Sequence, residues 1–110
     1  KKKIHDAYKD SISKIDGLSI MSAPMYSRSN FWINLLKVEK KYKLSKKNLL
    51  KKLISKNIEA RSIWYPNHLQ KPYKNYQTYK IKMANNIFKN YICLCIFIDF
   101  FACKIFVYVS

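Results

Sequence analysis

Residues 30–64 have the sequence NFWINLLKVEKKYKLSKKNLLKKLISKNIEARSIW, and this stretch determines the fold. Its first part, Asn30 to Val38, is a short run of bulky apolar residues that is typical of a strand buried on at least one face. Ser45 can cap the helix that follows. Ile58 to Trp64 then predicts a second strand. Such a strand–helix–strand unit usually returns to its own sheet with a right-handed crossover, although the two strands need not be immediate neighbours.

The helix inside this stretch is amphipathic, and Asn57 is expected to end it. One side should be core and the other should be solvated. The core side holds Leu49, Leu50, Leu53 and Ile54, and the solvated side holds Lys46, Lys47, Lys51, Lys52 and Lys56.

On the N-terminal side, residues 1–16 predict a helix. Its apolar residues Ile4, Ala7, Tyr8, Ile12 and Ile15 recur at spacings of three and four. Gly17 should stop this helix. His5 falls on the polar side, so we expect a surface residue there. Leu18 to Ser29 is expected to be a loop or an extended passage.

On the C-terminal side, Thr78 to Lys89 has helical spacing, and Tyr91 to Leu94 predicts a third short strand. The expected fold class is therefore α+β, with a small sheet of about three strands flanked by helices. From Cys95 the chain becomes almost continuously apolar. This tail is too short and too interrupted for a transmembrane helix, which needs about 20 apolar residues.

The formal net charge of +16 in 110 residues leaves two interpretations open. Clustered cations bind nucleic acid or an anionic membrane. However, only Arg28 and Arg61 are arginines, and the lysines are scattered and mixed with Asn, Ile and Tyr, which are all residues of AT-rich codons. A biased genome explains the charge more simply than a ligand does, so we expect no specific nucleic-acid partner.

No complete catalytic or metal-binding arrangement is visible. A chain with one glycine cannot build a glycine-rich phosphate loop, and its six acidic residues are dispersed. Cys93, Cys95 and Cys103 lack the paired spacing of a zinc site, so we expect no metal and interpret them as thiols in a reducing cytosol. No signal peptide is apparent, which also favours a cytoplasmic location.

The segment RSIWYPNHLQKPY, residues 61–73, holds the candidate site residues Arg61, Trp64, His68 and Gln70. Sites are commonly built where a strand ends in a stiff loop, because the scaffold fixes polar side chains that water still reaches. The alternative is that Trp64 and Tyr65 close the edge of the core and His68 lies on the surface.

Four segments of the chain carry a family resemblance: FWINLLKV, KKNLLKKLISKNIEAR, RSIWYPNHLQKPY and MANNIFKNYICL. They resemble the C-terminal small domain of the DegT/DnrJ class of sugar-nucleotide aminotransferases, which are fold-type I pyridoxal-phosphate enzymes. The third most resembles the subgroup that makes amino sugars for bacterial surface glycans. By this resemblance, residues 1–17 are the helix that leads into the domain, residues 18–94 are the small domain, and residues 95–110 are an atypical apolar tail.

The resemblance implies transfer of an amino group, usually from glutamate, to a nucleotide-linked keto sugar, with pyridoxal phosphate as cofactor and a homodimer partner. The Schiff-base lysine and the carboxylate on the pyridine nitrogen belong to the family's large domain, upstream of the matched segments. We therefore expect a fragment without catalytic residues, inactive and without cofactor when alone. Arg61, Trp64, His68 and Gln70 are carried over as substrate-binding residues at the mouth of the active site.

The tail departs from the family, whose members continue after the equivalent of Leu94 with a proline–serine segment and a last helix. A shift of reading frame after Leu94 would explain the change. The alternative is a tail that contacts a membrane or a partner, and we expect no membrane contact.

Overall fold

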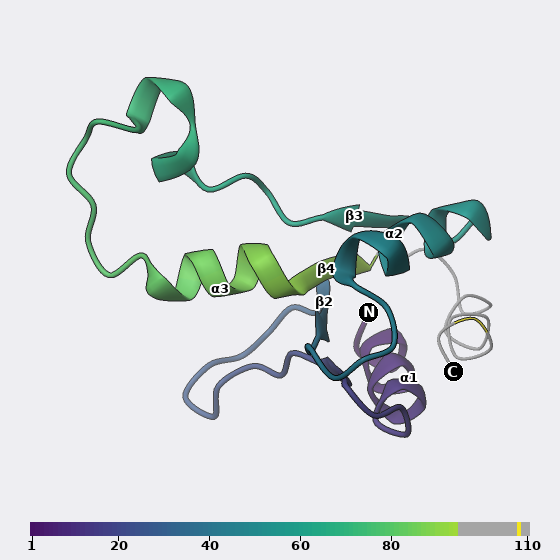
Figure 1. Ribbon diagram of the computed structural model, residues 1–110. Helices are drawn as coiled ribbons and strands as arrows, with labels where there is room; N and C mark the ends of the chain where they lie inside the picture. Colours follow the sequence, from purple (N-terminus) through teal and green to yellow (C-terminus); the bar gives the residue numbers. More distant parts are fainter. Residues whose placement is uncertain (95–107, 109–110) are drawn as a thin grey trace.

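The computed structural model describes residues 1–94 and residue 108 (Figure 1). Three α-helices, four strands and two short 3-10 helices follow one another in this part of the chain. In chain order they are α1 (Lys2–Ile12), β1 (Leu18–Ile20), β2 (Asn34–Val38), α2 (Lys46–Ser55), β3 (Ala60–Ser62), η1 (Asn67–Leu69), η2 (Lys71–Tyr73), α3 (Lys82–Asn90) and β4 (Tyr91–Leu94).

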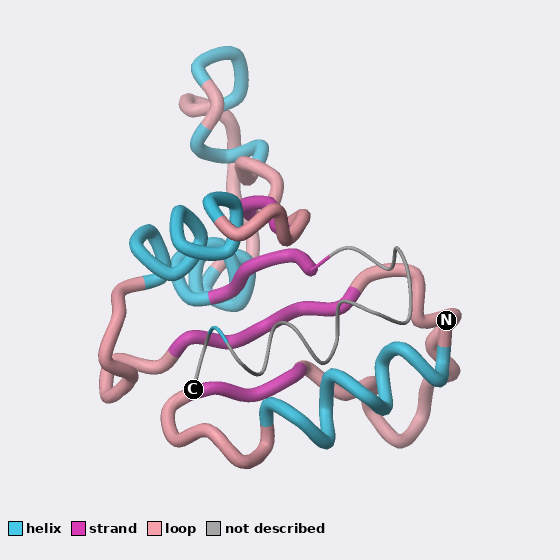
Figure 2. The backbone as a smooth tube through the Cα atoms, turned by 90° about the vertical axis from the view of Figure 1, so that its right-hand side faces the viewer, coloured by secondary structure: helices cyan, strands magenta, loops and turns pink. Residues whose placement is uncertain are grey.

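The four strands form one sheet in the order β1-β2-β4-β3, and every neighbouring pair is antiparallel (Figure 2). β2 and β3 therefore run parallel to each other, with β4 between them. The predicted α+β class is confirmed, and the strand–helix–strand unit returns to one sheet. Its two strands are not immediate neighbours, an arrangement that the sequence left open. β1 is an additional strand in the segment expected to be a loop or an extended passage.

One face of the sheet is covered by α1 and α2. Alternate strand residues on this face are buried together with Tyr8 and Ile12 of α1 and Leu49 and Leu53 of α2. The strand residues are Leu18, Ile20, Leu36, Val38, Ala60, Ile92 and Leu94. Burying large aliphatic side chains contributes about 1.5–3 kcal/mol each, so this layer supplies most of the driving force for folding.

The predicted ends of α2 are confirmed. Ser45 Oγ accepts a hydrogen bond from the backbone N–H of Asn48 at 3.3 Å, which caps the first turn. Asn57 adopts a left-handed φ of 57° directly after the helix, a conformation that asparagine tolerates well. Two expectations about the faces of α2 are wrong. Ile54, which was expected in the core, is 54% exposed. Lys46, which was expected to be solvated, is half-buried and donates a hydrogen bond from Nζ to the Phe88 carbonyl at 2.5 Å.

Between β3 and α3 the chain extends away from the sheet, and we call residues 63–81 the arm (Figure 1). The arm contains η1 and η2 and no buried residue. Within the part of the chain that the structure describes, no helix has the length and apolarity needed to cross a bilayer. Apart from Tyr108, the predicted apolar tail lies outside the described residues.

Candidate functional site

Within the described part of the chain, α1 and α2 pack on the first face of the sheet and leave the second face uncovered by either. Leu35, Cys93 and Arg61 form one row across it, because Leu35 and Arg61 both pair with Cys93 from opposite sides. Leu35 and Cys93 are half-buried and Arg61 is exposed. Burial raises the pKa of the Cys93 thiol, which keeps it protonated and unreactive at neutral pH.

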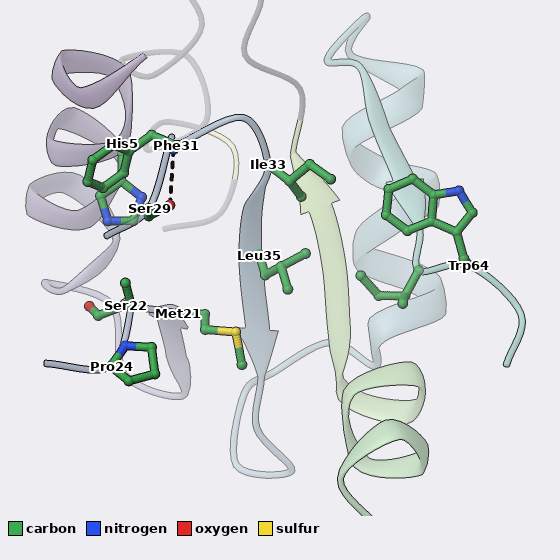
Figure 3. A pocket seen from close by; sticks show the side chains of 11 residues that line it. His5, Met21, Ser22, Pro24, Ser29, Phe31, Ile33, Leu35 and Trp64 are labelled. Carbon is green, nitrogen blue, oxygen red and sulfur yellow. Dashed lines mark hydrogen bonds between the residues drawn. The ribbon is translucent and has the colours of Figure 1, made fainter. Parts of the chain in front are cut away.

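A cavity of about 330 Å³, which we call the sheet-face cavity, lies at the end of this face where β2 begins (Figure 3). Ile33 and Leu35 lie in its middle, the indole of Trp64 on one side, and the rings of His5 and Phe31 on the other. Its remaining lining residues are Met21, Ser22, Ala23, Pro24, Ser29 and Ile63. The cavity is thus mainly apolar, with a few polar groups near one end.

His5 corrects a prediction from the sequence, because it is 7% exposed and not a surface residue. Its Nδ1 lies 2.8 Å from Oδ1 of Asn34. Asn34 is the first residue of β2 and is 1% exposed. Nδ2 of Asn34 has no hydrogen-bond partner among the described residues. A polar pair therefore joins α1 to the sheet within a mainly apolar layer, and helical periodicity alone could not indicate this pair.

The loop before β2 holds Phe31 against this histidine. The two rings have centroids 4.9 Å apart and are tilted by 50°. Phe31 has a φ of 53°, an uncommon conformation for a bulky residue that costs about 1 kcal/mol or more. Its backbone N–H donates to Ser29 Oγ at 3.0 Å, which helps to hold the turn. A local hydrogen bond and the contact between the two rings therefore hold this wall of the cavity in place.

Of the four site residues predicted from the sequence, Trp64 lines the sheet-face cavity and Arg61 lies on the same face. Trp64 is 66% exposed, so it does not close the core edge. The guanidinium Nη2 of Arg61 contacts Glu59 Oε1 at 2.7 Å in an exposed ion pair. Such pairs contribute about 0–1 kcal/mol, and Arg61 can exchange its partner readily.

His68 and Gln70 lie on the arm, away from the residues that line the sheet-face cavity. His68 Nε2 is 2.8 Å from Oδ1 of Asn85 on α3, which ties the arm to that helix. The Gln70 amide donates to the Tyr65 carbonyl at 3.0 Å and to Asn67 Oδ1 at 3.1 Å. Both side chains are thus engaged in shaping the arm.

The lining of the sheet-face cavity does not fit a pyridoxal-phosphate site by itself. It contains no lysine to form a Schiff base and no carboxylate to hold a pyridine nitrogen. Among the residues that the structure describes, no cluster of His, Cys, Asp and Glu could hold a metal ion. The cavity can stack and hydrogen-bond a ligand, but it offers no covalent chemistry.

Comparison with known proteins identifies the family of this chain. A sequence model of the DegT/DnrJ/EryC1/StrS aminotransferase family matches residues 1–102, and the chain belongs to that family. The match runs past Leu94, where the small domain was expected to end.

Individual relatives agree with this family. The chain is 30% identical over 95 residues to EpsN of Bacillus subtilis (strain 168), which is described as a pyridoxal phosphate-dependent aminotransferase. The alignment covers 83% of this chain and 24% of EpsN. DesI, solved in the presence of its TDP-sugar product, matches with a TM-score of 0.82 at 12% identity over 96% of this chain and 28% of DesI. GDP-4-keto-6-deoxymannose-3-dehydratase, solved with a trapped PLP-glutamate geminal diamine, matches with a TM-score of 0.77 at 18% identity over 98% of this chain and 30% of its own length. The chain thus spans less than a third of each of these relatives.

Proposed function

We propose that this chain is the C-terminal small domain of a pyridoxal-phosphate-dependent aminotransferase that acts on a nucleotide-linked keto sugar in the biosynthesis of a surface glycan. The observation that carries the proposal is the family match over residues 1–102. The TDP-sugar product of DesI and the GDP-linked keto sugar in the name of the dehydratase support the choice of a sugar nucleotide.

In this proposal the chain works with a large domain and in a homodimer, in the cytoplasm, and is inactive alone. Pyridoxal phosphate, when bound by the complete enzyme, supplies the electron sink for moving an amino group from glutamate to the keto carbon. Because the lining of the sheet-face cavity holds neither a lysine nor a carboxylate, we assign none of the chemical steps to this chain. Its task is to bind and orient the substrate.

The residues divide this task according to their places in the fold. The forked guanidinium of Arg61 suits a phosphate or a carboxylate, and the exposed face of Trp64 suits a base or a sugar ring. His68 and Gln70 are proposed to shape the mouth of the cleft, since their hydrogen bonds hold the arm in place.

The coding DNA upstream of Lys1 provides the test. We expect it to encode a large domain with a Schiff-base lysine. The two parts produced together should absorb at the aldimine band with pyridoxal phosphate, become labelled after borohydride reduction, and convert glutamate to 2-oxoglutarate with a keto sugar nucleotide. The purified chain alone serves as control and should do none of these. A lysine of this chain labelled at one position, or an upstream region without a large domain, would contradict the proposal.

A further inference from the structure

The helix α3 carries the arm but lies outside the core layer. All of α3 is in the described part of the chain, and none of its residues is buried. Its last residue, Asn90, leads directly into β4. Because core packing does not fix the direction of this helix, contacts made by individual side chains must orient it relative to the sheet.

Lys46 makes such a contact, because it joins the start of α2 to the end of α3. Its Nζ donates to the Phe88 carbonyl at 2.5 Å and lies 5.1 Å from the centroid of the Phe88 ring. The last carbonyls of a helix have no partner within it, and a cation there also meets the negative end of the helix dipole. Lys46 therefore holds α3 by a charge-assisted hydrogen bond and by a cation–π contact with the same residue.

The arm is attached to the same end of α3. The ring of Tyr65 meets the ring of Phe88 edge to face at a centroid distance of 5.3 Å. His68 Nε2 lies 2.8 Å from Asn85 Oδ1. Asn85 and Phe88 are three residues apart, so they share one side of the helix. A continuous chain of contacts thus runs from Lys46 through Phe88 to the arm.

The remainder of the arm gives it little support of its own. Its residues are exposed or half-buried, and Tyr73, Tyr76 and Tyr79 are 50%, 71% and 79% exposed. Where the arm returns to α3, Lys80 has a φ of 49°, an uncommon conformation for a residue with a side chain. The contacts with α3 therefore decide where the arm lies.

We propose that Lys46 is a positioning residue for the arm: it fixes α3 against α2, and α3 in turn sets where His68 and Gln70 lie relative to the sheet. This inference rests on the proposed function, in which those two residues shape the mouth of the cleft. Removal of the ammonium group removes both of its contacts with Phe88. The helix α3 and the arm should then loosen together while the core layer stays folded.

NMR spectroscopy of the purified chain tests this with two readouts. Nuclear Overhauser contacts between the rings of Tyr65 and Phe88 report the place of the arm, and residual dipolar couplings report the direction of α3 relative to the strands. In Lys46→Met the ring contacts should weaken at least about twofold, because a charge-assisted hydrogen bond is missing. The couplings of α3 should no longer fit the alignment tensor of the strands.

Two variants serve as controls. Lys47→Met removes the same charge from the next residue of α2, which is exposed, and should leave both readouts as in the wild type. Lys46→Arg should also preserve both, since a guanidinium group can donate to the carbonyl and stack on the ring. A lower urea midpoint in Lys46→Met with unchanged ring contacts and couplings would show a stabilising role only and would overturn the proposal.

If Lys46→Met does not fold, the wild-type chain decides the question. Nuclear Overhauser contacts between the Lys46 ε-methylene and the Phe88 ring are expected, together with one alignment tensor for α3 and the strands. Absence of either result would overturn the proposal. Neither readout involves pyridoxal phosphate, a sugar nucleotide or a large domain, so the role of Lys46 can fail while the aminotransferase assignment stands, and the reverse.

Discussion

The buried pair of His5 and Asn34 leads to a prediction about stability. Asn34→Leu removes the acceptor and keeps a side chain of similar size, so Nδ1–H of His5 is left unpaired at a residue only 7% exposed. Leaving a buried polar group unpaired costs about 1–3 kcal/mol. His5→Phe should cost a similar amount, because it leaves Oδ1 of Asn34 unpaired. The double variant should regain most of the loss, since replacing both partners by apolar groups is nearly neutral.

Urea unfolding followed by circular dichroism measures these differences. With a slope of about 2 kcal/mol per molar urea, a loss of about 2 kcal/mol lowers the midpoint by about 1 M. Asn48→Leu, on the exposed side of α2, is the matched control and should change stability by no more than about 0.5 kcal/mol. The reasoning is refuted if Asn34→Leu alone is as stable as the wild type, or if the double variant loses the sum of the two single losses.

Further predictions concern the turn, the cap, the charges and nucleic acid. Gly17→Ala should lower the free energy of unfolding by at least about 1 kcal/mol, because Gly17 has a φ of 79° and an added Cβ would lie 2.8 Å from the backbone nitrogen of Tyr42; an unchanged urea midpoint would contradict this. Ser45→Ala should cost about 1 kcal/mol in the same assay through loss of the helix cap, whereas Ser45→Asp should cost little. The hydrogen bond from Lys41 holds the pKa of Asp16 below its ordinary value. The small stabilising contribution of this pair is therefore present above the ordinary pKa and is lost as pH falls through the folded-state pKa. Asp16→Asn should flatten the pH–stability curve in this acidic range, and a curve identical to that of the wild type would show that the pair contributes nothing. Binding to random DNA should disappear at physiological salt, and salt-resistant binding would favour a basic binding protein instead.

The sequence predicted the parts of the fold that local rules control. Ser45 and Asn57 mark the ends of α2 because capping and left-handed backbone are properties of single residues. Strands were expected at Asn30 to Val38 and at Tyr91 to Leu94 because bulky apolar residues concentrate there, and the first of them begins only at Asn34. β1 has only three residues, Leu18–Ile20, and its pairing with β2 depends on a long-range contact that no local pattern reports.

The candidate site was predictable only in part, because burial of polar groups is decided by tertiary packing. Trp64 and Arg61 were expected at the end of a strand; Arg61 lies on the second face of the sheet and Trp64 lines the sheet-face cavity. His5 was assigned to the surface because a helical wheel counts histidine as polar, and only the position of Asn34 on β2 explains its burial. The available signal was an asparagine, Asn34, within an apolar strand pattern, because a buried polar side chain there needs a hydrogen-bond partner.

The strand order has a consequence for synthesis of the chain. β4 lies between β2 and β3, yet it is the last of the described strands to leave the ribosome. Until then, β2 and β3 each expose an edge whose N–H and C=O groups have no neighbour to bond. The nascent domain therefore keeps unpaired strand edges until residues 91–94 have been synthesised. During this interval it is most prone to aggregation, and a chaperone would be needed most.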